Sequence, residues 1–468
     1  MSAAVPRTFH IRTFGCQMNE HDSERLAGML IADGLEPVDD VEEADVVVLN
    51  TCCIRENADN RLYGHLGQLK ALRQRRPDLQ IAVGGCLAQK DGDEVRRRAG
   101  HVDVVFGTHN LARAPALLRR AAREGPVVEI LDVPPAAADD LPHALSAARQ
   151  LSYAAWVTIQ SGCDNSCAFC IVPQVRGPEV SRPFDDIVAE VTALARQGVS
   201  EVTLLGQNVN SYGRDLTRRG PLFASLLEAV GAVPGVRRVR FTSPHPKDLR
   251  PETVAAMAGT PAVCEHLHLP LQSGSDAVLA AMRRGYRAER YLERLAMARA
   301  QVGDLAVTTD LIVGFPGETE ADFCDTLAVV AEAGYDSAYT FVFSPRPGTR
   351  AAAAPERFVP DEVVAERFER LRAVVERSAL ARHRARVGRV EEVLVEGPSK
   401  RDPGLLTGRT RQNKLVHFAP PHTGDAGVGA YAEIEVTGAA PHHLRGELVA
   451  VTAPAPSRRR LPVTVSAR

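Results

Sequence analysis

The stretch GCDNSCAFC, Gly162–Cys170, places three cysteines in a C-x3-C-x2-C spacing. It follows a strand-like run, Ala154–Gln160, so the thiols of Cys163, Cys167 and Cys170 can fold around one metal centre. Thiolates favour zinc or iron–sulfur clusters. A structural zinc site needs a fourth protein ligand, and the nearby sequence offers none. We therefore expect a four-iron cluster with one iron left open for a small-molecule ligand.

The region around this motif repeats a strand-then-helix pattern six times, which is the signature of βαβ units. Six units predict a partial (β/α)6 barrel, related to the complete eight-unit barrel. The cysteine motif follows the first strand, on the face where barrel active sites form. S-adenosylmethionine has the amino and carboxylate groups that suit an open iron there. The expected strands are Ala154–Gln160, Glu201–Gly206, Val236–Thr242, His266–Leu271, Ala306–Val313 and Ser337–Phe343.

Three further strand ends of this barrel carry small and amide-bearing residues on the same face. They are GQNVNSY (Gly206–Tyr212), HLPLQSGSD (His268–Asp276) and DLIVGFPGET (Asp310–Thr319). Such residues suit the ribose, adenine and methionyl groups of S-adenosylmethionine, although Gly and Pro punctuate any βα turn. An aromatic ring between the cluster cysteines is either a cofactor contact or a packing residue. The candidate cofactor-binding residues are Phe169, Gln207, Asn208, Gln272, Ser273 and Gly314.

The first 125 residues alternate continuous β-branched runs with helical stretches, which predicts a doubly wound parallel sheet. Cys16, Cys52 and Cys86 each follow one of its first three strands. Since the carboxyl ends of parallel strands share one edge, these thiols should converge there and bind a second cluster. Cys53 competes with Cys52, and spacing alone does not separate them. The expected strands are Phe9–Gly15, Ala44–Thr51, Gln80–Gly85 and Val102–Gly107.

The end of the chain has a different character. A long amphipathic helix, Pro360–Arg386, precedes short strands with Gly and Pro turns, which predict a small all-β barrel of OB-like size. Basic residues outnumber acidic ones from residue 382 onward, whereas the rest of the chain is acidic, so we expect a polyanion to bind locally. One hairpin of this barrel gathers candidate phosphate contacts. They are Arg409, Arg411, Asn413 and Lys414.

Composition limits the remaining possibilities. Nine cysteines without an apolar leader argue against a disulfide framework, and Cys264 and Cys324, which have no partners in sequence, are expected in the core. No apolar run is long enough to span a bilayer, so we expect a cytoplasmic protein with no membrane partner. The expected units are a cluster-binding domain, a linker, a barrel core, a C-terminal barrel and a disordered tail. They cover residues 7–125, 126–150, 151–384, 385–452 and 453–468.

Four motifs together resemble the methylthiotransferase family of radical S-adenosylmethionine enzymes. They are TFGCQMNEHDSE, NTCCIRENA, GGCLAQ and GCDNSCAFCIVPQVRGPEVSRP. The resemblance extends to about Thr452, and six cysteines match at once. It implies two 4Fe-4S clusters, S-adenosylmethionine as cofactor, and Cys52 rather than Cys53 as a ligand. It also implies that the C-terminal barrel is a TRAM domain, which is an RNA-binding module.

The motifs are most similar to the branch of the family that acts on tRNA. That branch adds a methylthio group to carbon 2 of an N(6)-dimethylallyl (isopentenyl) adenosine beside the anticodon. It uses two molecules of S-adenosylmethionine and an electron donor such as flavodoxin or ferredoxin, and an unpaired anticodon-loop base can be splayed into a pocket. Sister enzymes act on threonylcarbamoyl-adenosine in tRNA or on an aspartate of a ribosomal protein. A non-catalytic iron–sulfur RNA-binding protein is the alternative from a different class.

Overall fold

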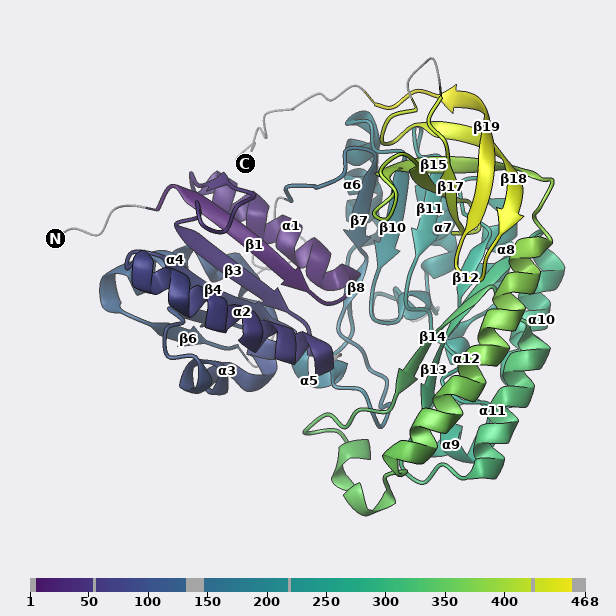
Figure 1. The fold of residues 1–468 in the computed structure, drawn as a ribbon, viewed down its shortest axis with the longest axis horizontal. Coiled ribbons are helices and arrows are strands. Elements are labelled where there is room, and N and C mark those ends of the chain that lie inside the picture. Colours follow the sequence, from purple (N-terminus) through teal and green to yellow (C-terminus); the bar gives the residue numbers. More distant parts are fainter. Residues whose placement is uncertain (1–5, 54–55, 132–146, 218–219, 422–425, 457–468) are drawn as a thin grey trace.

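The computed structural model contains an N-terminal parallel sheet, a central half-barrel and a small closed C-terminal barrel (Figure 1). This is the α/β architecture with a terminal all-β barrel that the sequence predicts. The segments 132–146 of the expected linker and 457–468 of the expected tail lie outside the described residues. Within the described part of the chain, no helix has the length and apolar character needed to cross a membrane. The structure describes residues 6–53, 56–131, 147–217, 220–421 and 426–456.

The N-terminal unit is a six-stranded parallel sheet in the order β2-β1-β3-β4-β5-β6. Helices α1 and α4 pack in one apolar cluster on one face, and α2 and α3 pack in another on the opposite face. The sheet is therefore doubly wound, as predicted. The strands are β1 Thr8–Phe14, β2 Glu36–Pro37, β3 Val46–Thr51, β4 Gln80–Gly85, β5 Val104–Phe106 and β6 Val127–Glu129. The helices are α1 Gln17–Ala32, α2 Glu56–Arg75, α3 Cys86–Arg98 and α4 Ala114–Glu124.

This sheet has two short edge strands that the sequence analysis did not anticipate. Strand β2 pairs with β1 at one edge, and β6 pairs with β5 at the other. Because β6 falls in the segment expected to be linker from residue 126, the N-terminal unit extends at least to Glu129. A strand of three residues is too short to produce a recognisable periodic pattern.

The central unit is a half-barrel of six parallel strands, each followed by a helix. The strands form two three-stranded sheets, β11-β10-β7 and β12-β13-β14, which an isolated bridge between Val239 and Val263 connects. Among the described strands, β7 and β14 each pair on one side only, so the barrel is open between them. The strands are β7 Ala154–Thr158, β10 Glu201–Leu205, β11 Arg238–Phe241, β12 His266–His268, β13 Ala306–Val313 and β14 Ser337–Val342.

Alternation along these strands divides the barrel into an outer and an inner face. Val157, Val202, Leu267 and Leu311 belong to one large apolar core shared with the surrounding helices. The residues between them therefore point to the inner face, which is polar and aromatic. The helices are α6 Phe184–Arg196, α7 Phe223–Gly231, α8 Pro251–Gly259, α10 Ala288–Gln301, α11 Glu320–Ala333 and α12 Asp361–Arg384.

The C-terminal unit is a closed five-stranded barrel in the order β15-β16-β17-β19-β18. It docks where the strands of the half-barrel begin: Arg238, at the start of β11, donates to the carbonyl of Glu392 at 2.9 Å. Figure 1 shows it as the yellow region, at the opposite end of the half-barrel strands from the helix α5 (Val172–Arg176). The strands are β15 Val390–Pro398, β16 Leu406–Thr410, β17 Leu415–Phe418, β18 Tyr431–Ala439 and β19 Leu444–Ala453.

Candidate active site

Three thiols meet at the carboxyl edge of the N-terminal sheet. Cys16 precedes α1, Cys52 follows β3, and Cys86 is the first residue of α3. Strands β1, β3 and β4 are neighbours, so the three positions share one edge. A hydrogen bond with Cys52 lowers the pKa of Cys16, and the charge of Cys16 acts on Cys86 to raise the pKa of that thiol. The three cysteines therefore lie at one edge of the sheet, as the spacing predicts, and their binding of a shared cluster stays a prediction.

The loops at this edge have little room for other residues. Gly15 has a φ of +146°, and a Cβ there would lie 2.4 Å from the Cβ of Cys52. The thiol of Cys16 donates to Oδ1 of Asn19 at 3.4 Å, and Nδ2 of Asn19 donates to the carbonyl of Thr51 at 3.3 Å. The lack of a side chain at Gly15 thus lets the first two cysteine loops approach each other, and the hydrogen bonds of Asn19 connect them.

Cys52 and Cys53 differ in their surroundings. Cys53 is fully buried in the apolar cluster between the sheet and α2, where a hydrogen bond with Cys86 and burial raise its pKa. The hydrogen bond with Cys52 and the charge of Arg176 instead lower the pKa of Cys16 to about 6. The structure thus places Cys52 beside Cys16 and Cys53 beside Cys86, and Cys52 rather than Cys53 as a cluster ligand stays a prediction.

The second group of thiols lies in the loop between the short strand β8 (Gln160–Ser161) and α5. The amide of Cys163 donates to the carbonyl of Gly177 at 3.1 Å, and the amide of Cys170 donates to that of Cys167 at 3.1 Å. All three thiols are partly exposed. The loop therefore curls around one point at the carboxyl end of the first barrel strand, where the sequence places the active site.

The electrostatics of the barrel thiols are set by burial and by one arginine. Burial raises the pKa of Cys163, and it raises the pKa of Cys170 to about 12. Arg284, which is 6% exposed, donates from its guanidinium to the sulfur of Cys167 at 3.3 Å. A second guanidinium nitrogen of Arg284 donates to the carbonyl of Pro270 at 3.3 Å. Burial thus disfavours the ionised forms of Cys163 and Cys170, and the positive charge of a bound metal centre would offset this effect.

The candidate cofactor loops surround this cysteine group, but several of their side chains are engaged within the protein. Nδ2 of Asn208 donates to Asp248 at 2.8 Å, and the Ser273 hydroxyl lies 3.1 Å from that of Thr326. Both residues are buried, and Oδ1 of Asn208 has no hydrogen-bond partner among the described residues, so its contact with a cofactor stays a prediction.

The other candidates in these loops have different surroundings. The amide of Gly314, at φ +77°, donates to Glu318 at 2.9 Å. Gln272 also has a positive φ, 71°, and Phe169 packs beside the buried Met282 and Phe315. No side-chain contact defines a role for Gln207 in this structure, and its contact with a cofactor stays a prediction.

The inner face of the half-barrel carries a polar pair and exposed aromatic rings. Nε2 of His268 lies 3.4 Å from Asp310, and its Nδ1 lies 2.9 Å from the hydroxyl of Thr308. The ring of Tyr339 meets that of His268 edge-on at 6.1 Å. Although they are at inner positions of β14, Tyr339 and Phe341 remain 58% and 37% exposed. The inner face is therefore accessible beside the open edge of the barrel.

The hairpin between β16 and β17 differs from the sequence expectation. Arg411 is paired with Glu265 at 2.8 Å, and Nζ of Lys414 lies 2.6 Å from Asp336 with only 3% of the side chain exposed. Carboxylates gather where the barrel strands begin, and they draw these two cations inward. Both residues thus help to dock the C-terminal barrel: Lys414 is buried in this contact, whereas the side chain of Arg411 remains 23% exposed and its contact with RNA stays a prediction.

The other two hairpin residues have different surroundings. Arg409 is 40% exposed and pairs with Glu396 at 3.0 Å. Asn413 occupies the turn at φ +62°, and its carbonyl accepts from Arg409 at 3.1 Å. Of the three hairpin cations, Arg409 has the most exposed side chain, at 40%, compared with 23% for Arg411 and 3% for Lys414.

Comparison with protein families accounts for all three units. Residues 8–107 match the uncharacterized protein family UPF0004, residues 157–330 match the radical SAM superfamily, and residues 384–449 match the TRAM domain. Among similar proteins, the tRNA-2-methylthio-N(6)-dimethylallyladenosine synthase of Acidothermus cellulolyticus is 55% identical, over 95% of this chain and 88% of that protein. The synthase of Salinispora arenicola is 54% identical, over 95% and 89%. The chain belongs to this family of synthases.

Solved structures support the same fold for the family's barrel. The radical S-adenosylmethionine methyltransferase TsrM from Kitasatospora setae, with cobalamin and a [4Fe-4S] cluster bound, matches with a TM-score of 0.54. It is 14% identical and covers 74% of this chain and 77% of its own. At this identity the likeness concerns the fold alone.

Members of this family use S-adenosylmethionine and two four-iron clusters, and both cysteine groups suit such clusters. None of the nine cysteines, all of which are described, forms a disulfide. Among the described residues, no three acidic, histidine or cysteine side chains converge tightly enough for a single metal ion. A single zinc ion draws thiolates to about 2.3 Å, whereas a four-iron cluster holds them around a larger core. The two groups of three cysteine thiolates offer the soft ligands that iron–sulfur clusters take.

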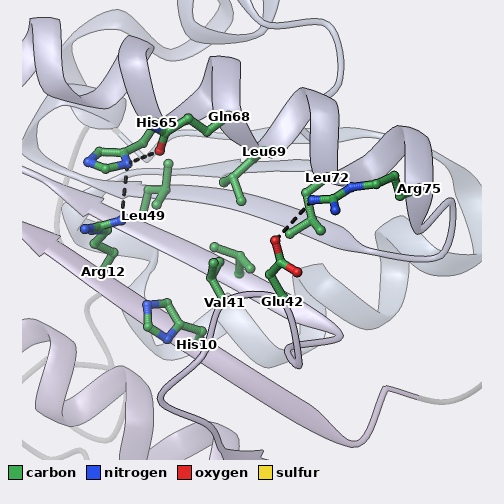
Figure 2. Close-up of a pocket in the computed structure, with 11 residues that line it drawn as sticks. His10, Arg12, Val41, Glu42, Leu49, His65, Gln68, Leu69, Leu72 and Arg75 are labelled. Carbon is green, nitrogen blue, oxygen red and sulfur yellow. Dashed lines mark hydrogen bonds and ion pairs between the residues drawn. The ribbon is translucent and has the colours of Figure 1, made fainter.

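One pocket of the N-terminal unit lies away from both cysteine groups (Figure 2). Val41, Leu49, Leu69 and Leu72 supply its apolar walls, and none of the cysteines lines it. Polar side chains, including a Glu42–Arg75 ion pair at 3.1 Å, frame it between α2, β1 and the loop before β3. It is therefore separate from the candidate active site.

Sequence reasoning missed the two arginines that face the thiols, Arg176 and Arg284. Both are 6% exposed, and neither stands in a spacing pattern that marks it as functional. A buried arginine is rare enough to be informative, but burial is visible only in the structure. Cys324 was expected in the core and is instead exposed on α11, whereas Cys264 is buried as expected.

Proposed function

We propose that this chain is a radical S-adenosylmethionine enzyme that converts N(6)-dimethylallyladenosine beside the tRNA anticodon to its 2-methylthio derivative. The observation that carries the proposal is the presence of two three-thiol groups, each at the carboxyl edge of a parallel sheet. One such group suffices to generate a radical, and a sulfur-inserting enzyme requires the second. The synthases it resembles, at 51–55% identity, are named for this reaction.

The proposal divides the work between the two groups. When bound, the cofactors supply the 5′-deoxyadenosyl radical that removes the ring hydrogen, and the sulfur and methyl group that replace it. The chain itself binds and orients these groups and excludes water. Arg284 fixes Cys167 by its hydrogen bond, and Phe169 packs against the apolar cluster behind the loop. The proposed cluster ligands are Cys163, Cys167 and Cys170 in the barrel, and Cys16, Cys52 and Cys86 in the N-terminal unit.

The inner face of the half-barrel supplies the proposed place for the adenine ring. Tyr339 and Phe341 are exposed aromatic rings on one edge strand, and Trp156 stands at an inner position of the other edge strand. Bases taken out of a stack are commonly held between aromatic side chains. An unpaired anticodon-loop base can enter between β7 and β14, and the His268–Asp310 pair lies beside it.

The C-terminal barrel supplies a proposed contact with the rest of the tRNA. Arg409, at 40% exposure, is the hairpin cation most available to a phosphate. Arg409→Ala should weaken tRNA binding without changing catalysis at saturating tRNA, and it should lower the salt dependence of binding by about one ion. An unchanged salt slope would remove Arg409 from the RNA interface.

The proposal also includes a cytoplasmic location, with tRNA as the substrate and a flavodoxin or ferredoxin as the electron donor. In the cell, such a donor would supply the electrons that the chemical reductant dithionite supplies in a reaction with purified protein. The corresponding test is turnover with reduced flavodoxin or ferredoxin in place of dithionite, and failure with both donors would exclude this part of the proposal.

The function is tested by anaerobic reconstitution with iron, sulfide, dithionite and S-adenosylmethionine. Three substrates are compared by mass spectrometry: an anticodon stem-loop with dimethylallyladenosine, the same stem-loop with threonylcarbamoyl-adenosine, and a ribosomal protein with the target aspartate. We expect a methylthio product with the first only. A product with either of the others reassigns the substrate, and no 5′-deoxyadenosine with any of them supports a non-catalytic RNA-binding protein.

A further inference from the structure

The short helix α5 connects the two cysteine groups. It begins at Val172, directly after the barrel cysteine loop, and ends at Arg176. Val175 belongs to the apolar cluster of the N-terminal unit, together with Cys53 and Cys86. The hydroxyl of Thr108 donates to the carbonyl of Val175 at 2.5 Å. The segment that carries the barrel cysteines is therefore anchored in the core beneath the N-terminal thiols.

Arg176 brings a positive charge into this core. Its guanidinium lies 2.7 Å from a carboxylate oxygen of Asp22 on α1, and both side chains are 7% exposed. A buried guanidinium is costly without compensation, so its partner and its position are tightly determined. Arg176 is thus fixed from both sides, by α5 and by α1.

Arg176 is held between the elements that carry two of the N-terminal thiols: its partner Asp22 is on α1, which begins directly after Cys16, and its neighbour Val175 shares an apolar cluster with Cys86. The charge of Arg176 lowers the pKa of Cys16, after the hydrogen bond with Cys52, and that of Cys86, after the hydrogen bond with Cys53. Asp22 acts on Cys86 in the opposite direction. The charges of a single ion pair therefore have opposite effects on the same sulfur.

We propose that Arg176 is a positioning residue for the N-terminal centre: held by Asp22, its guanidinium offsets the negative charge of the cluster and favours its reduced form. This rests on the proposed second cluster at Cys16, Cys52 and Cys86. Each added electron makes a cluster more negative, and a fixed positive charge lowers the energy of that state most strongly in a buried environment. Because α5 follows the barrel cysteines directly, the same arginine also ties the N-terminal centre to the barrel loop.

The test measures the reduction potential of the N-terminal cluster by electron paramagnetic resonance during a redox titration. It uses the full chain carrying Cys163→Ala, Cys167→Ala and Cys170→Ala, so that only the N-terminal cluster remains. In this background Arg176→Gln should shift the potential to more negative values, and Asp22→Asn should shift it to less negative values. Arg176→Lys, which keeps the charge, should remain closest to the parent protein.

Opposite shifts separate an electrostatic role from a structural one. If Arg176 only braces the fold, loss of either ion-pair partner should disturb the centre in the same direction, and that result would overturn the proposal. An unchanged potential in Arg176→Gln would overturn it as well. Arg284→Gln is the matched control, because Arg284 is equally buried but contacts Cys167. A parent protein that binds no iron at the N-terminal thiols would instead refute the proposed function.

Discussion

The two cysteine groups occupy equivalent positions in two different sheets, but their electrostatic surroundings are opposite. At the N-terminal edge, the hydrogen bond with Cys52 and the charge of Arg176 lower the pKa of Cys16 to about 6. In the barrel loop, burial raises the pKa of Cys170 to about 12. The protein itself prepares a thiolate at the first site, whereas thiolates at the second depend on the positive charge of bound iron.

The two sites also differ in access. Two of the three N-terminal thiols, Cys52 and Cys86, are 1% and 2% exposed and Cys16 is partly exposed, whereas all three barrel thiols are partly exposed. An enclosed site suits a centre that stores sulfur away from solvent. A more open site suits a centre that must admit S-adenosylmethionine and a nucleobase. Two groups of three cysteines can therefore serve different functions because the nearby charges and the solvent exposure of their thiols differ.

The largest expected effect is loss of the barrel cluster. Cys163→Ala should reduce both 5′-deoxyadenosine and the methylthio nucleoside to the detection limit, because three thiolates are needed to hold the cluster. Both products are measured by mass spectrometry after anaerobic reconstitution. Cys324→Ala, which alters an exposed thiol on α11, should retain full turnover. Continued formation of 5′-deoxyadenosine by Cys163→Ala would contradict the claim that the barrel cysteines hold the cluster that generates the radical.

The next prediction separates the adjacent cysteines of the N-terminal group. Cys52→Ala should lose about half of the bound iron, since one of two clusters is lost. Cys53→Ala should keep the iron and lose about 1 kcal/mol of unfolding free energy, because it removes one buried sulfur from the apolar core. Iron analysis and thermal unfolding measure the two outcomes. The reverse pattern would make Cys53 the ligand.

A smaller change tests the close approach of the N-terminal loops. In Gly15→Ala the new Cβ would lie 2.4 Å from that of Cys52, and the positive φ adds strain of about 1–3 kcal/mol. We expect loss of N-terminal iron while the barrel cluster remains. Gly34→Ala is the control, because its φ is also positive, +92°, but nothing lies within 4 Å of the added Cβ. Equal iron contents in the two variants would show that crowding at Cys52 is unimportant.

The most subtle prediction concerns pH in the iron-free protein. Alkylation of Cys16 should accelerate as pH rises through about 6, whereas Cys170 should stay slow to about 12. Because folding lowers the pKa of Cys16, its contribution to stability is complete above the unfolded thiol's value and disappears as pH falls through about 6. Mass spectrometry of peptides alkylated across a pH series measures both rates. Similar pH dependences of alkylation for Cys16 and Cys170 would contradict the proposed difference in electrostatic surroundings between the two cysteine groups.

Much of this fold follows from local patterns that the sequence displays directly. Buried β-branched runs and their spacing place Cys16, Cys52 and Cys86 at the ends of adjacent parallel strands, and the structure brings them together. The role of Lys414 could not be read in the same way. A lysine on a polar hairpin has the same local sequence whether it faces solvent or Asp336. Its direction depends on how two separate units dock.

The charges around the thiols are unpredictable for the same reason. Arg176 is near Cys170 in sequence, but its carboxylate partner, Asp22, comes from the first helix of the chain. The strand β6 could not be predicted because a segment of three residues is too short to show a periodic pattern of apolar residues. Spacing therefore predicts where the ligands gather, and only tertiary contacts determine what electrostatic field they experience.

The division of labour between the two cysteine groups is tested most directly in a variant with Cys16→Ala, Cys52→Ala and Cys86→Ala. Single-turnover reactions with a dimethylallyladenosine stem-loop are analysed for both 5′-deoxyadenosine and the methylthio nucleoside. Retained 5′-deoxyadenosine without any methylthio nucleoside is the predicted result. Formation of the methylthio nucleoside by this variant would contradict the account.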